Sequence, residues 1–268
     1  MSKSESGIAW PPRHNVIGVR VSATTYDGML EPVLAAARSG VCACVSHLAV
    51  HGVVEGSSDP EFRAMLDAFD VVAPDGHPVR HALNLLYHAG LPDRCYGPEF
   101  TLRVCGQAAR EGIGVYLYGS HQHVVEAMRD NLVARFPQLR IAGCEPSLFR
   151  PLTPEEDAAL VERVKASGAG VMFIGLGCPL QEKFAHVHRG RIPAVMVCVG
   201  AAFDFHAGTK AMAPAWMQRH SLEWLFRLLQ EPRRLWRRYL VYNSVFVWRF
   251  GLQYCGLRKY RSAAGPAS

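Results

Sequence analysis

The segment VMFIGLGCPLQEK, residues 171–183, joins a strand pattern to a helix pattern through a glycine-rich turn. Its first four residues form an unbroken apolar run, which is typical of a strand buried on both faces of a parallel sheet. Gly175 and Gly177 permit close approach of the backbone to a ligand. Ligands bind at the carboxyl ends of such strands, so we expect Gln181 to turn its amide toward one. The glycine spacing fits neither G-x-G-x-x-G nor a P-loop, so a dinucleotide fingerprint is not met.

Short apolar runs alternate with helical patterns along most of the chain. This alternation predicts an α/β fold with a Rossmann-like, largely parallel sheet flanked by helices. The strand pattern stops near residue 210, so we predict an α/β domain over residues 1–210 and a C-terminal basic helical appendage over residues 211–268. Strands are expected over residues 16–21, 41–46, 71–73, 114–118, 140–143, 171–174 and 194–199, and helices over residues 28–38, 60–69, 78–89, 98–111, 122–136, 154–167 and 180–188.

The composition describes a nearly neutral body with a basic C-terminal part. Of the 268 residues, 49% are hydrophobic, which is enough for a large core. The net charge is +6, but residues 219–261 hold ten Lys and Arg against two acids, and the remainder carries a net charge of −2. The chain shows no helix-turn-helix, zinc-finger or RNP-type motif, so nucleic acid is not expected as a partner.

The cysteines and the apolar runs bear on the compartment. The eight cysteines form no C-x-x-C pair and mostly lie in apolar runs, so we expect reduced core residues in a cytoplasmic protein. The N-terminal sequence lacks the apolar region of a signal peptide, so none is expected. No apolar run reaches the roughly 20 residues that span a bilayer. If the protein contacts a membrane, we expect it to lie on the surface.

The run PAWMQRHSLEWLFRLLQEPRRLWRRY, residues 214–239, interleaves aromatic residues with arginines. At about 100° per residue, one arc of a helix collects Leu235, Trp236, Tyr239 and Leu240, and the opposite arc collects Arg233, Arg234, Arg237 and Arg238. A basic amphipathic helix of this kind is typical of a segment that lies on an anionic membrane surface. Binding in a partner's groove and ordinary packing are the alternatives.

Other loops after predicted strands place reactive residue types at the expected ligand edge. Asp75, in a Pro-Asp-Gly sequence, suits a general base that activates a hydroxyl, and equally a turn former or helix N-cap. Gly119 ends a strand before a helix whose first N–H groups can hold phosphate, although a plain turn fits as well. Phe203 suits stacking on a base and Asp204 suits a ribose hydroxyl. The alternative there is a packed ring beside a capping carboxylate.

Two histidines lie close to the end of the predicted strand over residues 41–46. His47 and His51 have the i, i+4 spacing that can ligate a metal. No acid accompanies them as in H-E-x-x-H, so no metal site is predicted.

Taken together and in order, the motifs of this chain resemble those of the WecG/TagA/CpsF glycosyltransferase family, also called glycosyltransferase family 26. The resemblance covers about residues 16–250, and the last three motifs together are very specific. The motifs are Asp59-Pro60-Glu61-Phe62, Ala73-Pro74-Asp75-Gly76, Tyr96-Gly97-Pro98, Gly119, Phe136-Pro137, Gly175-Leu176-Gly177-x-Pro179-x-Gln181-Glu182-Lys183, Gly200-x-x-Phe203-Asp204-x-x-x-Gly208, Ala213-Pro214-x-Trp216-Met217-Gln218 and Leu222-Glu223-Trp224-Leu225-x-Arg227-Leu228-x-x-Glu231-Pro232-x-Arg234.

The resemblance implies an inverting transferase that moves a sugar from a UDP-sugar onto a polyprenyl-pyrophosphate-linked saccharide. It implies action at the inner face of the bacterial cytoplasmic membrane, in exopolysaccharide or envelope polysaccharide biosynthesis. It implies no metal or other cofactor, and homo-oligomerisation is left open. Asp75 maps to the proposed base of the family. The C-terminal helices are expected to close over the site and face the membrane.

Without a metal, arginines and helix N-termini must offset the charge of the leaving UDP. Since the α/β domain has few arginines at strand ends, we expect these arginines in the C-terminal appendage over residues 211–268. The residues expected at the diphosphates or the membrane are Arg227, Arg233, Arg234, Arg237 and Arg238, and those expected at the donor are Ser46, His47, Gly119, Gly175, Gly177, Gln181, Phe203 and Asp204.

One departure from the family pattern bears on the donor sugar. Many members carry Thr-x-Asn ahead of the Asp-Pro motif, and here His47 stands in place of Thr and Ala49 in place of Asn. This disfavours the donor of the N-acetylmannosamine transferases. It favours UDP-glucose or UDP-glucuronic acid, with His47 or His51 touching the sugar or its carboxylate.

Two other classes of protein remain open from the residues alone. One is a nucleotide-cofactor oxidoreductase on a doubly wound sheet, which the missing G-x-G-x-x-G disfavours. The other is a non-enzymatic adaptor whose basic tail binds membrane, RNA or a partner helix. Stabilisation by UDP would indicate the transferase, and stabilisation by NAD the oxidoreductase. Salt-dependent binding of nucleic acid without a response to UDP would indicate the adaptor.

Overall fold

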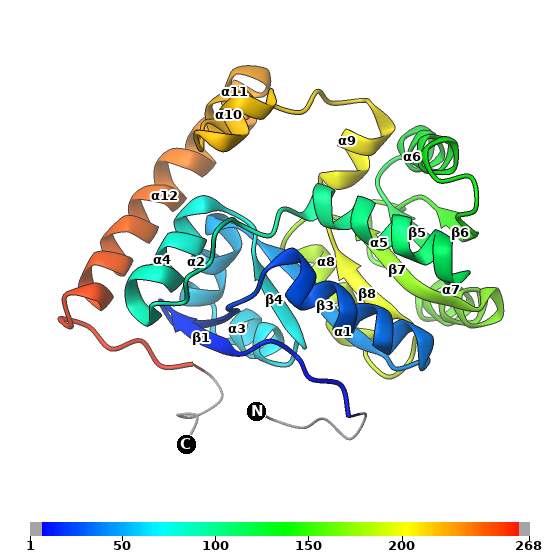
Figure 1. Cartoon of the computed structure of the whole chain (residues 1–268), viewed down its shortest axis with the longest axis horizontal. Helices are drawn as coiled ribbons and strands as arrows, with labels where there is room; N and C mark the ends of the chain where they lie inside the picture. The colour runs from blue at the N-terminus through cyan, green and yellow to red at the C-terminus, as the bar shows by residue number, and fades with distance from the viewer. Residues whose placement is uncertain (1–6, 263–268) are drawn as a thin grey trace.

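The computed structural model describes residues 7–262, apart from the side chains of Ala215, Arg234 and Arg238. A six-stranded sheet lies at its centre, with every strand parallel to its neighbours and the order β4-β3-β8-β7-β5-β6 (Figure 1). The predicted α/β fold with a parallel sheet is therefore confirmed. The strands are β3 (Ala43–Leu48), β4 (Val71–Pro74), β5 (Gly114–Gly119), β6 (Ile141–Glu145), β7 (Ala169–Gly175) and β8 (Val195–Cys198).

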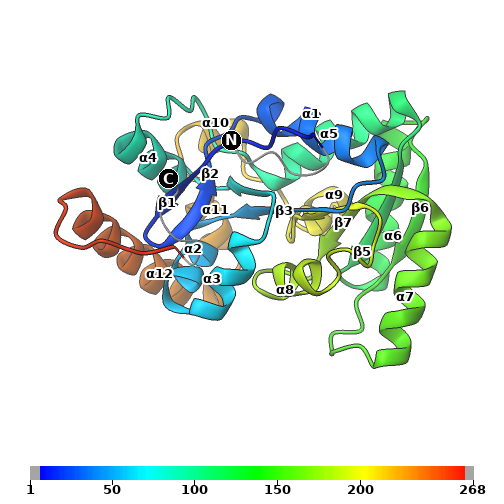
Figure 2. The same ribbon diagram turned by 90° about the horizontal axis from the view of Figure 1, so that it is seen from below.

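Helices cover both faces of this sheet (Figure 2). Successive side chains of a strand point to opposite faces, so strands that are apolar throughout need a layer of helices on each side. One face is covered by α1 (Tyr26–Arg38), α5 (Gly97–Glu111), α6 (Gln122–Arg135) and α9 (Ala202–Ala207). The other is covered by α2 (Val50–Ser58), α3 (Pro60–Asp67), α7 (Pro154–Ser167) and α8 (Leu180–Val187), with α4 (His77–Tyr87) beside the edge strand β4.

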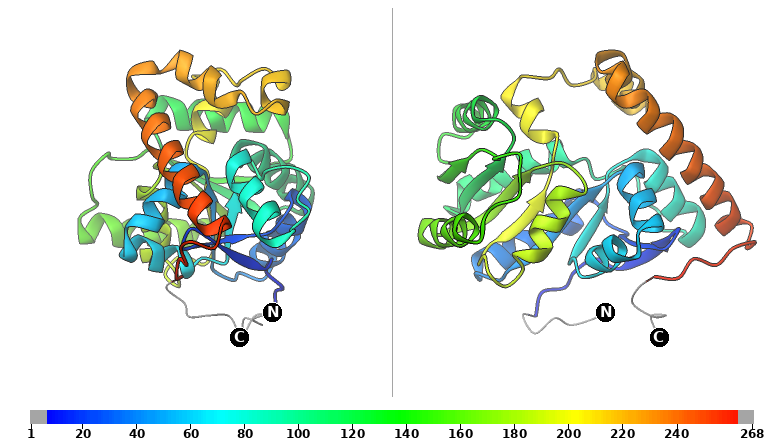
Figure 3. Two further views of the ribbon diagram at one scale, coloured as in Figure 1. Left: turned by 90° about the vertical axis from the view of Figure 1, so that its left-hand side faces the viewer. Right: turned by 180° about the vertical axis from the view of Figure 1, so that it is seen from behind.

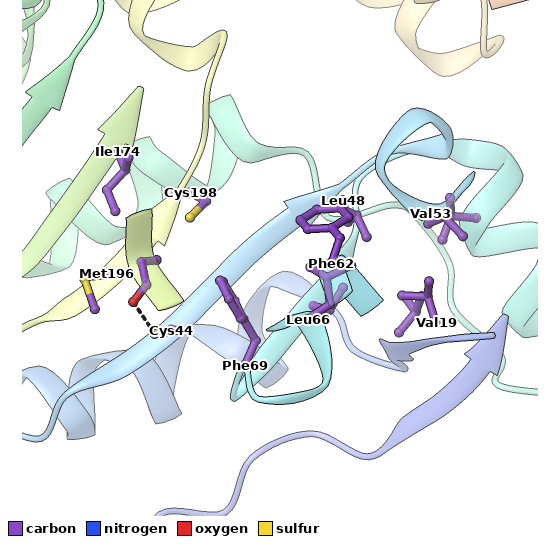
Figure 4. Close-up of a cluster of buried hydrophobic side chains, with 14 of the residues drawn as sticks. Val19, Cys44, Leu48, Val53, Phe62, Leu66, Phe69, Ile174, Met196 and Cys198 are labelled. Atoms are coloured by element: carbon purple, nitrogen blue, oxygen red, sulfur yellow. Dashed lines mark hydrogen bonds between the residues drawn. The ribbon is translucent and has the colours of Figure 1, made fainter. Parts of the chain in front are cut away.

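The core on the second face joins strands and helices that are distant in the sequence. Figure 4 shows Leu48 of β3, Val53 of α2, and Phe62 and Leu66 of α3 gathered beside Val19, and all five side chains are buried. Burial of a side chain of this size contributes about 1.5–3 kcal/mol. This core fixes α2 and α3 against the sheet, next to the carboxyl ends of β3 and β4.

Residues 16–21, predicted as one strand, instead form part of an antiparallel hairpin outside the main sheet. Its strands are β1 (Arg13–Val16) and β2 (Val19–Ser22). The N–H of Gly18, which has a φ of +101°, donates to the side-chain oxygen of Asn15 over 2.7 Å. The prediction was wrong because Ile17 occupies the turn as a buried residue, so the apolar pattern runs through the reversal without a break.

Two helices were missed from the sequence, α2 and α9. Three buried residues of α2 are Val50, Val53 and Val54, whose β-branched side chains lower intrinsic helix propensity. Packing against β3, α3 and the C-terminal helix supplies the stability that propensity does not. α9 has six residues, too few for a helical period to be seen.

The C-terminal segment forms three helices, α10 (Ala215–Arg219), α11 (Glu223–Gln230) and α12 (Pro232–Tyr254). Figure 3 shows α12 running along the outside of the body, with α10 and α11 at its N-terminal end. α12 packs mainly on α2 and α11. A long helix thus carries two short ones over the edge where β3 and β4 end.

The predicted apolar arc of α12 is divided between the body and the solvent. Leu235 is only 1% exposed and packs inward, and Tyr239 is half-buried on the same side. Trp236 and Leu240 are 54% and 63% exposed. The orientation of α12 about its own axis explains this division, because it also turns Phe246, which is 3% exposed, onto the body. One part of the arc therefore packs on the body, and the other part is exposed.

Gly119→Ala should lower the free energy of unfolding by about 2 kcal/mol or more. Gly119 has a φ of +130°, and an added Cβ would lie 2.6 Å from the backbone carbon of Gly175. Urea unfolding measures the change. Gly251→Ala in α12 is the control, because nothing lies within 4 Å of a Cβ there and alanine favours a helix. Equal stability of the two variants would contradict the close approach of β5 and β7.

Candidate active site

A cavity of about 380 Å³ lies at the carboxyl ends of β3 and β4, beneath the C-terminal helices. The body contributes Asp75 after β4, Arg94 and Tyr96 before α5, and residues of α2 and α4. The roof comes from α11, with Glu223 and Arg227, and from α12. Parallel strands end at one edge of a sheet, so the fold places these loops together although they are distant in sequence.

Asp75 stands in the wall of this cavity. Its backbone N–H donates to the carbonyl of Leu48 over 3.2 Å, which ties the loop after β4 to the end of β3. The backbone N–H of Gly97, the first residue of α5, favours the ionised Asp75 carboxylate and so lowers its pKa. The N-terminus of a helix carries a partial positive charge, so it stabilises the ionised form of a carboxylate. Asp75 is therefore held in place while part of its side chain opens on the cavity.

Burial raises the pKa of Asp75 to about 8. The Arg94 guanidinium opposes this rise, the Glu223 carboxylate adds to it, and Arg227 and the Gly97 N–H oppose it again. Desolvation destabilises a carboxylate far more than it does a carboxylic acid, and here it outweighs the nearby cations. A group that holds its proton near neutral pH and can release it is suited to proton transfer.

Arg94 and Glu223 form an ion pair across the cavity wall. Both residues are buried, at 9% and 7% exposed. The Arg94 guanidinium lies over the ring of Tyr96 at 4.2 Å. The backbone N–H of Tyr96 donates to the hydroxyl of Tyr26 over 2.9 Å. A cation of the body and an anion of α11 thus meet beside Asp75.

The arginines of the C-terminal helices differ in whether they line the cavity. Arg227 lines the cavity, and its guanidinium lies 5.7 Å from the centroid of the Phe205 ring. Arg233 and Arg237 are exposed and do not line it. The side chains of Arg234 and Arg238 lie outside the described residues. Of the tail arginines with described side chains, only Arg227 therefore faces Asp75.

Ser46, Gln181 and Glu182 form a buried polar cluster on one face of the sheet. The Ser46 hydroxyl donates to Oε1 of Glu182 over 2.8 Å, and Nε2 of Gln181 donates to the same oxygen over 2.9 Å. Burial raises the pKa of Glu182. Oε1 of Gln181 is buried without a hydrogen-bond partner, 3.2 Å from where a Cβ on Gly200 would stand. The Ser46 hydrogen is used inside the protein, and Gln181 turns its carbonyl oxygen toward the strand-end loops.

His47 lies on the opposite face from Ser46, as alternation along a strand requires. Its Nδ1 lies 2.9 Å from the carbonyl oxygen of Cys95, which can only accept, so Nδ1 carries the hydrogen. Burial lowers the pKa of His47 to about 4. Its Nε2 is buried without a hydrogen-bond partner. The sequence placed Ser46 and His47 at one donor site, and the structure points them apart.

The other predicted donor residues surround the ends of β5, β7 and β8. The ring of Phe203 is fully buried, and a Cβ on Gly175 would lie 2.5 Å from it, so this ring is closed to stacking by a base. Asp204 accepts from the side chains of Thr209 at 3.4 Å and Lys210 at 3.3 Å. Gly177 has a φ of +79°, and no atom lies within 4 Å of where its Cβ would stand. These residues lie outside the cavity that contains Asp75.

The described residues contain no group of three His, Cys, Asp or Glu side chains placed to hold a metal ion. His51 lies in the cavity wall with its Nε2 3.6 Å from a carboxylate oxygen of Glu55. The ring of His51 meets the ring of Tyr242 of α12 edge-on at 4.6 Å. In this arrangement His51 contacts the C-terminal helix.

Comparison with protein-family models identifies the family to which this chain belongs. The model of the glycosyl transferase WecG/TagA/CpsF family matches residues 14–260. The chain belongs to this family. It is a glycosyltransferase, and the resemblance of its motifs is confirmed.

Two curated relatives carry the same name, N-acetylglucosaminyldiphosphoundecaprenol N-acetyl-beta-D-mannosaminyltransferase. The one from Bacillus spizizenii (strain ATCC 23059 / NRRL B-14472 / W23) is 31% identical over 187 residues, covering 69% of this chain and 70% of the relative. The one from Bacillus subtilis (strain 168) is 27% identical over 228 residues, covering 85% and 86%. Both names describe a sugar transfer to a lipid-diphosphate-linked sugar.

Several residues in the wall of this glycosyltransferase's cavity were missed from the sequence. Arg94 lies two residues before the Tyr96-Gly97-Pro98 motif, Tyr96 is its first residue, and Glu223 is in the Leu-Glu-Trp motif. Cations were sought only in the tail, because Arg94 follows no strand directly. Its position just before the α5 motif was the available signal. The structure shows that the body supplies an arginine at this point as well as the tail.

Asp75→Asn should stabilise the folded enzyme, and more so as the pH rises from about 4 to 8. In the unfolded chain the carboxyl ionises near its ordinary pKa of 3.8, whereas in the folded chain it keeps its proton up to about pH 8. The wild type therefore loses stability over this range and the amide does not. Thermal unfolding at pH 5 to 9 measures the difference. A difference for Asp75→Asn that does not change with pH would contradict the raised pKa of Asp75.

Proposed function

We propose that this enzyme transfers a hexose, hexuronic acid or N-acetylhexosamine from a UDP-sugar to a polyprenyl-diphosphate-linked saccharide, with inversion at the anomeric carbon. The observation that carries the proposal is the position of Asp75 in one cavity wall with Arg94 and Arg227. The names of both relatives support a lipid-diphosphate acceptor. We place the reaction at the inner face of the bacterial cytoplasmic membrane, in exopolysaccharide or envelope polysaccharide biosynthesis.

Asp75 acts as general base in this proposal. Its ionised carboxylate takes the proton of the acceptor hydroxyl as that oxygen attacks the anomeric carbon and the bond to UDP breaks. The departing diphosphate gains negative charge, which Arg94 and Arg227 offset. The chemistry then needs no metal or other cofactor. Because the base must be ionised, kcat/KM should rise with pH through the pKa of Asp75, about 8.

The donor sugar is proposed to be other than N-acetylmannosamine. Ala49, in the place of the family Asn, lines the cavity with a methyl group and offers no amide. UDP-glucose or UDP-glucuronic acid fits this loss of a hydrogen-bonding group better. Gln181 is proposed to contact the donor through its unpartnered carbonyl oxygen, held in that orientation by Glu182.

Asp75→Asn should reduce sugar transfer at least 1,000-fold while UDP binding stays within a few-fold of the wild type, because the amide cannot take a proton. The measurement is UDP release over a panel of UDP-sugars with a lipid-diphosphate-linked acceptor. UDP binding by calorimetry is the control for folding. Near-normal turnover by the variant would remove Asp75 from the role of base.

We propose in addition that residues 211–268 form an appendage that seats the enzyme on an anionic membrane surface, and that residues 1–210 form the catalytic domain. None of the described helices combines the length and apolarity that crossing a bilayer requires. α12 nevertheless exposes Trp236, Leu240, Val247 and Trp248, the last at 69%. Arginines interleave with these residues in the sequence, and such a surface suits headgroups and the acyl boundary.

Trp236→Glu combined with Trp248→Glu should lower binding to phosphatidylglycerol vesicles about tenfold or more, because two apolar anchors become acidic. Vesicle sedimentation measures this. Phe149→Glu is the matched control, since Phe149 is 64% exposed and lies on the loop between β6 and α7, away from α12. If the double variant sedimented with the vesicles as well as the wild type does, that result would contradict membrane binding through α12. The substitutions are cleaner than truncation at residue 210, which would also uncover the body surface that packs against Leu235 and Phe246.

A further inference from the structure

Glu223 brings a carboxylate from the C-terminal helices onto an arginine of the α/β body. It lies 129 residues from Arg94 in the sequence, and the two side chains form a buried ion pair in the wall that holds Asp75. Isolated surface pairs are exposed and screened, whereas this one is enclosed with the candidate base. The Glu223 carboxylate thus pairs with an arginine that faces the reaction cavity. We ask what this pairing means for a ligand of the cavity.

Arg94 keeps its position by contacts that do not involve Glu223. Its guanidinium stacks at 4.2 Å over the ring of Tyr96, and its backbone N–H donates to Asp93 over 2.7 Å. The following residue, Cys95, donates its N–H to the carbonyl of Pro74 over 2.9 Å, which joins the segment to the end of β4. Arg94 is thus an arginine already oriented toward an anion by the body itself.

Glu223 is the partner that can move. It is the first residue of α11, a helix of eight residues that packs chiefly on α10 and α12. The links from α11 to the body include the ion pair of Glu223 with Arg94 and the contact of Arg227 with Phe205. Removal of Glu223 from Arg94 would therefore release one of the links that tie α11 to the α/β body.

The charges in the cavity also indicate that Glu223 competes with an anionic ligand. Two arginines, Arg94 and Arg227, line it with two carboxyl groups, Asp75 and Glu223. The Glu223 carboxylate cancels one of the two positive charges, so the cavity attracts a diphosphate less strongly while Glu223 remains. A carboxylate and a phosphate present similar oxygen pairs to a guanidinium, so one can replace the other on Arg94.

We infer that Glu223 is a built-in substitute for a substrate diphosphate, which pairs with Arg94 until a diphosphate binds and displaces it. Displacement frees α11, so that ligand binding and movement of the roof occur together. The diphosphate belongs either to the nucleotide donor or to the lipid-linked acceptor. The inference deepens the proposed function and rests on it for the identity of the ligand.

Binding of inorganic pyrophosphate to the full-length enzyme tests the inference by isothermal titration calorimetry. Glu223→Gln should bind pyrophosphate about tenfold more tightly than the wild type, because its competing charge is gone. Glu61→Gln, the same change at an exposed residue of α3, should leave binding unchanged. Combining Glu223→Gln with Arg94→Gln should abolish the gain. Parallel titrations with UDP and with farnesyl diphosphate show which source of diphosphate gains from the substitution.

Equal or weaker pyrophosphate binding by folded Glu223→Gln would overturn the inference, since Glu223 would then support Arg94 rather than compete for it. Circular dichroism and urea unfolding establish folding, and Glu223→Asp replaces it if the amide variant is unfolded. The shorter side chain keeps the charge but withdraws it from Arg94, so it should still tighten binding. A transfer assay on the wild type separates the two proposals: transfer without any gain in Glu223→Gln refutes only the inference.

Discussion

The packing of α12 against α2 is the contact on which the candidate active site depends. Phe246 is buried there, the Tyr242 hydroxyl donates to Glu55, and Arg249 donates to the hydroxyls of Ser57 and Ser58 over 2.9 and 2.8 Å. α2 in turn is fixed by its core with β3 and α3. This chain of contacts sets where α11 lies, and so makes a roof over the carboxyl ends of β3 and β4.

The enclosure formed by that roof sets the electrostatics of the cavity. An exposed aspartate after a strand would be ionised at neutral pH, whereas burial raises the pKa of Asp75 to about 8. The same enclosure strengthens the attraction of Arg94 and Arg227 for an anionic ligand. The body contributes one of these arginines and the appendage the other, so the charge arrangement is complete only when the two parts are together.

α12 also links the proposed membrane seat to the proposed chemistry. One side of the helix packs on the body through Leu235 and Phe246, and the other exposes Trp236 and Trp248. A helix that rests on a membrane while it supports α11 would bring the cavity to a lipid-linked acceptor at the surface. A movement of α12 and α11 relative to the body would reach the active site at the ion pair of Glu223 with Arg94.

The sequence by itself determined the α/β class, the parallel strands and the family, because apolar periodicity and motif order are local properties of the chain. It also identified Asp75, Gln181 and Arg227 as residues of interest. Only the tertiary structure decided that Arg94 and Glu223 meet beside Asp75, and that Ser46 and His47 point to opposite faces of the sheet. The hairpin at Ile17 and the helix α2 were likewise fixed by burial, against local pattern and propensity. The physical reason is that contacts between distant segments, and the burial they create, leave no periodic trace in the sequence.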